Sequence, residues 1–263
     1  MKLFNREIGD GKPVFIIAEA GVNHNGSLAT AKHMVDIAKE CGADAIKFQK
    51  RSLADLYRPE VLKRPSDESH SLGVYIPILR DCELDENAHQ ILMEHCDRRK
   101  INYLCSPWDI PSVDFLETLG VQAYKIPSAC LSDIYLAQRV ATTGKPVIFS
   151  TGMHSQGEII QMANYHRNDL GLGDRSAYLH CISSYPTANR DVNLGFLRTL
   201  AVITGTPVGY SGHERGIPIT AAAVAFGAHI IERHFTMDRT QAGPDHAASL
   251  EPHGLETLVR HIR

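Results

Sequence analysis

The sequence predicts an α/β protein with a (β/α)₈ or TIM barrel, preceded by a short N-terminal hairpin. Two observations predict this fold. Short aliphatic and β-branched runs alternate with amphipathic helical segments along the whole chain, mostly at intervals of about 20–30 residues. The strand-like runs are apolar throughout instead of alternating, as expected when helices cover a parallel sheet. We therefore expect a single barrel domain over residues 1–263.

The elements follow in order along the chain. Lys2–Pro13, with Gly9-Asp-Gly11 as its turn, is expected to form a hairpin that plugs the bottom of the barrel. The predicted strands are Val14–Glu19, Ala43–Gln49, Ile101–Ser106, Ala123–Ile126, Val147–Ser150, Ala177–His180, Pro207–Tyr210 and Ala228–Glu232. The predicted helices are Leu28–Cys41, Glu86–Lys100, Ile110–Leu119, Leu131–Thr142, Glu158–His166, Leu194–Ile203, Ile217–Phe226 and Pro252–Arg263. Several of these helices end at a glycine, the residue that suits a left-handed helix terminus.

One long stretch, Lys50–Asp85, breaks the regular alternation. It is rich in charge and is interrupted by Pro59, Pro65 and Pro77, so we expect an irregular loop. Loops of this length inside a compact domain are usually functional or mobile. Because it follows the second barrel strand, it should lie on the face where such barrels carry their active sites.

Composition excludes several classes of protein. Hydrophobic residues make up 43% and charged residues 22% of the 263 residues, as in soluble enzymes, and a net charge of −3 gives no general attraction to nucleic acid or anionic lipid. No apolar run reaches membrane-spanning length, and the first residues lack the core of a signal peptide. The six cysteines form no C-x-x-C pair, which indicates reduced thiols. We expect a cytoplasmic enzyme.

Polar residues gather where the predicted strands end, which is the catalytic face of this fold. They are Glu19, Lys47, Ser106, Lys125, Ser128, Ser150, Ser183, Ser211, His213, Glu232 and His234. Two lysines, several hydroxyls and nearby helix N-termini suit a small ligand that carries phosphate and carboxylate groups. The alternative is a set of internal salt bridges, such as Glu19 with Lys47. A lysine at this face could also form a Schiff base with a carbonyl substrate.

Two histidines stand at the exits of the last two predicted strands. His213 lies in Tyr-Ser-Gly-His and His234 in Ile-Glu-Arg-His, so their imidazoles should be neighbours. With Glu19, Glu232 or Asp245 nearby, the pair could hold a divalent metal, and such a site suits manganese, iron, cobalt or zinc better than calcium. With two protein ligands, the remaining positions would be open to water and substrate. The alternative is a pair of hydrogen-bonded imidazoles that orient loops.

Several motifs, spread in order over nearly the whole chain, resemble those of the sialic acid synthase family, which includes N-acetylneuraminate, legionaminic acid and pseudaminic acid synthases. The matching segments are Ile17–Gly26, Ala45–Gln49, Tyr124–Ser128, Ser150–Met153, Leu179–Cys181 with Tyr185–Thr187, Gly209–His213, Glu232–Thr236 and Gly243–Asp245.

The resemblance implies a condensation of phosphoenolpyruvate with a 2-acetamido sugar aldehyde. It would give a 2-keto-3-deoxy acid and phosphate, with cleavage of the C–O bond of phosphoenolpyruvate. The resemblance also implies a divalent cation, Mn²⁺ or Mg²⁺, held by His213 and His234, which polarises the aldehyde. It is consistent with a homo-oligomer, a dimer or a tetramer, that binds neither nucleic acid nor membrane.

The same resemblance assigns roles to individual residues. Glu19 matches an acidic residue for proton handling, and Asp245 matches a residue of the sugar and metal surroundings. The catalytic set is Glu19, Lys47, Lys125, His213, His234 and Asp245. The substrate-binding set is Asn23, Ser106, Ser128, Ser150, Ser183 and Ser211. Ser183 departs from the family pattern, because well-known bacterial members carry an asparagine at this place.

Many members of the family carry a C-terminal antifreeze-like domain that supplies an arginine to the N-acyl pocket of the partner subunit. No segment of this sequence matches that domain, so we expect either a short form of the family or a piece of a longer chain. Lys50–Asp85, with Tyr57, Arg58, Arg64 and Tyr75, is the candidate replacement, and the alternative is a solvated charged loop. Three other functions remain open: a Schiff-base aldolase, a different 3-deoxy-ulosonate synthase, and a barrel that binds sugar or phosphate without catalysis.

Overall fold

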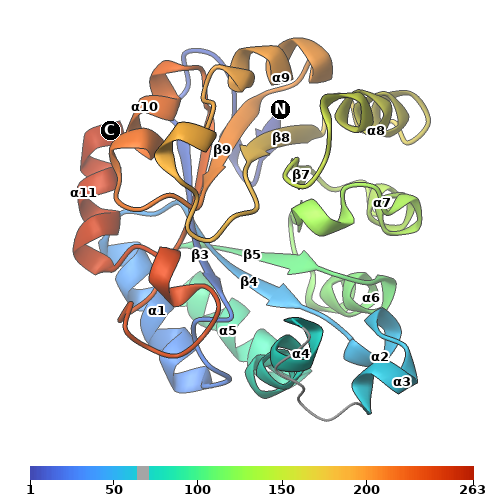
Figure 1. Ribbon diagram of the computed structural model, residues 1–263, viewed down its shortest axis with the longest axis vertical. Coiled ribbons are helices and arrows are strands. Elements are labelled where there is room, and N and C mark those ends of the chain that lie inside the picture. Colours follow the sequence, from blue (N-terminus) through green and yellow to red (C-terminus); the bar gives the residue numbers. More distant parts are fainter. Residues whose placement is uncertain (64–70) are drawn as a thin grey trace.

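A barrel of parallel strands inside a ring of helices forms the centre of the protein (Figure 1). The structure, a computed structural model, describes the backbone of residues 1–63 and 71–263. The barrel strands are β3 (Phe15–Gly21), β4 (Ala45–Lys50), β5 (Asn102–Pro107), β6 (Tyr124–Ile126), β7 (Val147–Ser150), β8 (Ser176–Cys181), β9 (Val208–Gly212) and β10 (Ile230–His234). Within these described ranges the eight strands pair in the order β5-β4-β3-β10-β9-β8-β7-β6, and β5 and β6 lie next to each other at the remaining seam. The sheet thus nearly closes, and the predicted fold class is confirmed.

The outer helices fall where the sequence places them. They are α1 (Leu28–Glu40), α5 (Glu86–Arg99), α6 (Ile110–Leu119), α7 (Ile134–Ala141), α8 (Gln156–Asn168), α9 (Phe196–Thr204), α10 (Pro218–Ala225) and α11 (Pro252–Ile262). The largest difference is at α7, which begins three residues after the predicted Leu131. The carboxylate of Asp133 accepts hydrogen bonds from the backbone N–H groups of Tyr135 and Leu136, so Asp133 caps the helix and fixes its start.

The prediction of an irregular loop over Lys50–Asp85 was wrong for much of that stretch. It contains α2 (Leu53–Leu56), α3 (Pro59–Leu62) and α4 (Ser71–Cys82), which Figure 1 shows beyond the end of β4. Pro59 occupies the first turn of α3, where a missing N–H group costs no hydrogen bond. Of the residues that the sequence singled out here, Arg64 and the side chain of Tyr75 lie outside the described part of the chain.

The N-terminal hairpin is present, but its turn is not the predicted one. β1 (Lys2–Leu3) and β2 (Arg6–Glu7) pair antiparallel around Phe4-Asn5, and Phe4 takes a positive φ of 52°. Gly9-Asp-Gly11 instead forms a separate turn after β2. Leu3 and Ile8, both buried, pack against the inward-facing residues at the N-terminal ends of the barrel strands. The hairpin therefore closes the bottom of the barrel.

Alternate residues of each strand point into the barrel, because side chains along a strand have a period of two. On β4, Ala45 faces the barrel interior, whereas Ile46 and Phe48 pack among the outer helices. The lower inward positions are apolar: Phe15, Ile17, Ala45, Leu104, Ile148, Ala177, Leu179 and Ile230 on the strands, and Ala123 just before β6. The next inward positions toward the C-terminal ends are mostly polar. The candidate residues therefore lie directly above this apolar layer.

The expectations about cysteines and membrane segments can be compared with the structure. All six cysteines are buried and free, so the prediction of reduced thiols is confirmed. In the described part of the chain, no helix is both long and apolar enough to cross a membrane.

Two buried histidines on outer helices bond to tyrosines on the barrel. On α5, His89 Nδ1 lies 2.7 Å from the hydroxyl of Tyr103, and on α8, His166 Nδ1 lies 2.9 Å from the hydroxyl of Tyr178. Burial lowers the pKa of His89 to about 3 and that of His166 to about 4. Both imidazoles are therefore neutral in the folded protein at any pH near neutral.

We predict that these two histidines make the fold sensitive to mild acid. In the unfolded chain a histidine takes up a proton near pH 6.5, whereas the folded chain does not until about pH 4. The contribution of these histidines to the free energy of unfolding is therefore fully present above pH 6.5. It falls as the pH drops toward 4, by about 1.4 kcal/mol per pH unit for each imidazole. Urea unfolding at several pH values should show a shallower dependence for the double variant His89→Gln/His166→Gln. Equal slopes for the two proteins would contradict the prediction.

Candidate active site

A cavity of about 350 Å³ opens at the C-terminal ends of the barrel strands. The residues that line it come from all parts of the chain: Glu19, Val22, Lys47, Gln49, Arg51, Tyr57, Leu79, Trp108, Lys125, Pro127, Ser128, Ala129, Ser150, Met153, Cys181, Ser183, Tyr185, Ser211, His213, Glu232, His234, Pro244 and Asp245. The barrel topology explains the gathering, because parallel strands bring their C-terminal ends to one rim.

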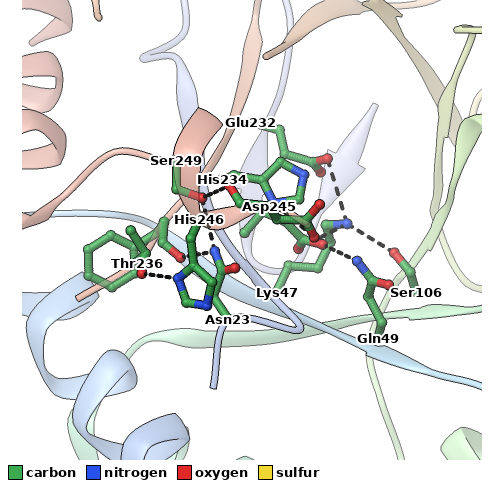
Figure 2. A network of polar contacts seen from close by, with 12 residues as sticks. Asn23, Lys47, Gln49, Ser106, Glu232, His234, Thr236, Asp245, His246 and Ser249 are labelled. Atoms are coloured by element: carbon green, nitrogen blue, oxygen red, sulfur yellow. Dashed lines mark hydrogen bonds and ion pairs between the residues drawn. The ribbon is translucent and has the colours of Figure 1, made fainter. Parts of the chain in front are cut away.

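Four charged side chains, all nearly inaccessible to solvent, occupy the floor of this cavity. Lys47 Nζ lies 3.0 Å from Glu19 Oε2 and 3.6 Å from Glu232 Oε1, and Lys125 Nζ lies 3.6 Å from the same oxygen of Glu232. Figure 2 shows Lys47 between Ser106 and Glu232. Internal ion pairs, which the sequence left open as an alternative to a ligand site, are therefore present. Two carboxylates therefore face two ammonium groups, and Lys125 is paired only through the Glu232 oxygen that Lys47 also contacts.

The two carboxylates titrate very differently. Burial raises the pKa of Glu19 to about 7, although Lys47 opposes the shift. Burial also disfavours the charged form of Glu232, but Lys125 and Lys47 outweigh that effect and lower its pKa to about 2. Glu232 is thus a fixed anion, whereas Glu19 can gain or lose a proton near neutral pH, as a general acid or base must.

Serine hydroxyls surround the two lysines. Lys47 Nζ donates to Ser106 Oγ at 3.0 Å, and Lys125 Nζ donates to Ser150 Oγ at 2.7 Å. Two further serines, Ser128 and Ser183, converge on Gly152, where an added Cβ would lie only 2.8 and 2.5 Å from their hydroxyl oxygens. A glycine is needed there because any side chain would displace these hydroxyls. The fifth hydroxyl, Ser211 Oγ, donates to Glu232 Oε1 at 3.2 Å.

The two histidines are neighbours in the cavity wall, as their positions in the sequence predict. The ring centroids of His213 and His234 are 5.4 Å apart, and the ring of Tyr185 lies 4.0 Å from that of His213. His213 Nδ1 lies 2.7 Å from the carbonyl oxygen of Ile182. If Nδ1 donates to that carbonyl, Nε2 is the open nitrogen, the arrangement typical of a metal-binding histidine.

His234 has a nitrogen without a hydrogen bond. Its Nδ1 is buried and lies 3.8 Å from Asp245 Oδ2, and burial lowers the pKa of the ring to about 4, which keeps it neutral. Burial lowers the pKa of His213 as well, but Cys181 Sγ, 3.9 Å from Nδ1, raises it overall, so a metal there would displace a proton. No group of three or more metal-type side chains occurs among the described residues. The donors present fit a site with two protein ligands and open positions.

A second buried ion pair fixes the segments that carry these histidines. Arg233 and Glu214, which are 1% and 0% exposed, pair at 3.0 Å. Arg233 NH1 donates to Thr220 Oγ1 at 2.7 Å, and Arg233 NH2 donates to the backbone carbonyl of Glu214 at 2.7 Å. The hydroxyl of Tyr210 donates to Glu214 Oε2 at 2.8 Å. Because Glu214 follows His213 and Arg233 precedes His234, this network fixes the positions of the two imidazoles relative to each other.

Comparison with known proteins identifies the family. Residues 34–263 match the NeuB family. The chain belongs to the NeuB family. The N,N'-diacetyllegionaminic acid synthase of Campylobacter jejuni is 40% identical over 259 residues, which cover 96% of this chain and 76% of that protein. The human N-acetylneuraminate-9-phosphate synthase is 39% identical over 260 residues, which cover 98% of this chain and 72% of that protein.

A solved structure agrees with this assignment to the NeuB family. The N-acetylneuraminic acid (sialic acid) synthetase of Leptospira borgpetersenii matches with a TM-score of 0.88 and 35% identity, covering 100% of this chain and 87% of that chain. The resemblance drawn from sequence motifs is therefore confirmed. As a NeuB-family member whose relatives are named synthases of sialic-type acids, the protein is an enzyme of the synthase class.

The cavity of this NeuB-family chain contains most of the residues predicted from sequence, but not all. Ser106 lies behind Lys47 and does not line the cavity. Asn23, predicted to bind substrate, is also absent from the lining; its amide donates to the carbonyl of Phe235 and to Ser249 Oγ, both at 2.9 Å (Figure 2). In this structure Asn23 joins two loops.

Sequence reasoning missed several residues of the cavity wall. Gln49 and Arg51 follow Lys47 at intervals of two residues, so the strand period could have placed both on the inward face. Tyr185 belongs to the matching segment Tyr185–Thr187, but the sequence assigns it no role in binding or catalysis. Trp108 carried no signal of its own, because its part in the site depends on the neighbouring Arg51.

We predict that Arg233→Met destabilises the protein by about 3–5 kcal/mol, because it leaves the carboxylate of Glu214 buried and unpaired. Urea unfolding measures the loss. The matched control is Arg139→Met, which breaks a partly exposed pair with Asp114 and should cost about 0–1 kcal/mol. Adding Glu214→Gln to the Arg233 variant should restore part of the stability. A loss of less than 1 kcal/mol for Arg233→Met would show that the pair is not needed.

Proposed function

We propose that the protein condenses phosphoenolpyruvate with an N-acylated sugar aldehyde to form a 2-keto-3-deoxy acid of the sialic type and phosphate. C3 of phosphoenolpyruvate forms the new bond to the aldehyde carbon. Water adds to C2, and phosphate leaves with cleavage of the bond between C2 and its bridging oxygen. The single observation that carries the proposal is that two buried lysines and two neighbouring histidines line the same cavity.

The lysine side of the cavity suits phosphoenolpyruvate. Lys47 and Lys125 would bind its carboxylate and phosphate groups, because ammonium groups in a buried site form strong charge-assisted hydrogen bonds with such anions. The hydroxyls of Ser128, Ser150 and Ser183 would donate to the remaining oxygens. Holding a weak carbon nucleophile within reach of the aldehyde is itself a large part of catalysis.

The histidine side suits the aldehyde. His213 and His234 would hold a divalent cation, Mn²⁺ or Mg²⁺, with Asp245 beside it. When bound, such a cation supplies Lewis-acid polarisation of the aldehyde oxygen. Glu19 sits on the strand between those of Lys47 and His234, where it would handle the proton that the new hydroxyl group requires.

Relatives support an N-acylated sugar. The names of two synthases about 40% identical to this chain both specify N-acetyl groups in the product. The chain is nearly equally similar in sequence to both, so phosphorylated and unphosphorylated N-acylated sugars are both candidate substrates. The expected homo-oligomeric state, cytoplasmic location and single-domain organisation likewise stay predictions.

One observation favours a second candidate, a Schiff-base aldolase. Burial lowers the pKa of Lys125, against the attraction of Glu232, and a lowered pKa makes an amine more available as a nucleophile. Borohydride reduction in the presence of a carbonyl substrate separates the two mechanisms. Covalent labelling of Lys125 or Lys47 would support the aldolase and contradict the condensation proposed here.

The decisive test of function is a panel assay of phosphate release. Phosphoenolpyruvate is mixed with N-acylated hexoses, their 6-phosphates and plain aldoses, in the presence of manganese. We expect phosphate release that depends on an N-acylated sugar, together with a new 2-keto acid of matching mass. Absence of phosphate release with every aldose would overturn the proposal.

We predict that His213→Ala and His234→Ala each abolish manganese binding, because among the described residues each removes one of the two imidazole donors that line the cavity. Calorimetric titration with MnCl₂ measures binding, and turnover should fall in parallel. His253→Ala, an exposed histidine on α11, is the matched control and should bind manganese normally. Full activity of either cavity variant in metal-free buffer would exclude a metal role for the pair.

A further inference from the structure

Arg51 is a buried cation in the cavity wall that the proposed reaction does not use. Its side chain is 4% exposed and lines the cavity, and the guanidinium lies 4.6 Å from the ring centroid of Trp108. Stacking on an aromatic face fixes the plane of a guanidinium and leaves its edge free to donate hydrogen bonds. Arg51 is therefore a rigid donor group rather than a flexible surface charge.

The nearest acidic residue does not satisfy this guanidinium. Glu83 Oε1 accepts from Lys50 Nζ at 2.8 Å and from the backbone N–H of Arg51 at 3.0 Å, whereas Glu83 Oε2 is 3.9 Å from Arg51 NH1, beyond hydrogen-bond range. Within the described residues, the guanidinium donates a hydrogen bond to one side chain, that of Gln49. A guanidinium has five N–H groups, so several donors remain for a ligand.

Gln49 ties Arg51 to the floor of the cavity. The Gln49 carbonyl accepts from Arg51, and its amide donates to Glu19 Oε1 at 2.9 Å. Figure 2 shows Gln49 beside Lys47 and Ser106. Arg51 follows Lys47 by four residues, so its backbone lies nearer the mouth than the lysines that would hold phosphoenolpyruvate. A ligand group at Arg51 therefore belongs to the second substrate.

The surroundings of Arg51 specify the chemistry of that group. Val22 and Leu79, each 5% exposed, line the same cavity and belong to a small apolar cluster separate from the main core. A donor edge and an apolar pair in the wall of one cavity suit a short acyl amide, whose carbonyl oxygen accepts hydrogen bonds and whose alkyl end is apolar. A phosphate group fits this place poorly, since part of its charge would face the apolar pair.

We propose that Arg51 is a specificity-determining residue that donates to the acyl carbonyl oxygen of the sugar, while the acyl methyl group packs against Val22 and Leu79. The inference rests on the proposed condensation and adds to it the residue of this chain that selects an acylated sugar. Arg51 follows β4, Val22 follows β3 and Leu79 lies on α4.

The test compares Arg51→Met with the wild-type enzyme, in manganese, on the best N-acylated hexose of the panel and on its 2-hydroxy parent. We expect kcat/KM for the acylated hexose to fall about 10- to 100-fold, the effect of losing a charge-assisted hydrogen bond. The parent hexose should change less than about threefold, a difference too small to reflect a lost hydrogen bond. If the parent is not turned over, its inhibition constant against the acylated hexose is measured instead. The KM for phosphoenolpyruvate and the affinity for MnCl₂ should not change.

Two further variants separate specific from general effects. Arg80→Met, at an exposed position on α4 outside the cavity lining, should behave as wild type on both sugars. Arg51→Lys keeps the charge but not the planar fork and should lose activity on the acylated hexose as well. Circular dichroism and thermal unfolding establish that the variants fold.

The possible outcomes are distinguishable. If the wild-type enzyme releases no phosphate with any aldose, the proposed function itself is wrong. If it does, an equal loss on the acylated and parent hexoses overturns the role of Arg51. A raised KM for phosphoenolpyruvate in Arg51→Met would assign the residue to that substrate, and a loss confined to sugar 6-phosphates would assign it to phosphate; either result also overturns the proposal.

Discussion

The organisation of this protein depends on placing two ammonium groups inside a barrel. Lys47 and Lys125 are almost completely buried, and a buried charge is strongly unfavourable unless partners compensate for it. Glu232, between them, supplies that compensation to both, and its own pKa falls to about 2 as a result. Glu19 pairs with Lys47, and burial raises its pKa to about 7. One arrangement therefore places two buried ammonium groups, a fixed carboxylate and a titratable carboxyl group in the same cavity.

A second buried ion pair, between Arg233 and Glu214, fixes the segments that carry His213 and His234. Successive residues of β10 face opposite ways, so Glu232 and His234 point into the barrel while Arg233 points into the helix layer. The guanidinium there joins Glu214 and Thr220, and thus links β10 to the segment after β9 and to α10. The same three-residue stretch lines the cavity on one face and pairs with the helix layer on the other.

Much of the fold and of the site could be predicted from sequence because both follow from short-range patterns. Alternating apolar runs and amphipathic segments indicate a barrel, and polar residues just after a strand must lie at its rim, which places Lys47 and His234 correctly. The helices in Lys50–Asp85 could not be inferred from prolines alone, because Pro59 begins a helix. The pairing of Arg233 with Glu214 depends on packing between elements, and the turn of Asn23 away from the cavity depends on the loops that it joins.

The hairpin beneath the barrel affects how molecules can come and go. Because Leu3 and Ile8 close the lower end with apolar side chains, the floor of the cavity has no second opening on that side. A molecule seated on the two lysines lies deepest, and whatever binds above it, between Arg51 and the histidines, stands in its path. If a molecule binds at the two lysines, we therefore expect it to enter before, and to leave after, any molecule that binds nearer the mouth of the cavity.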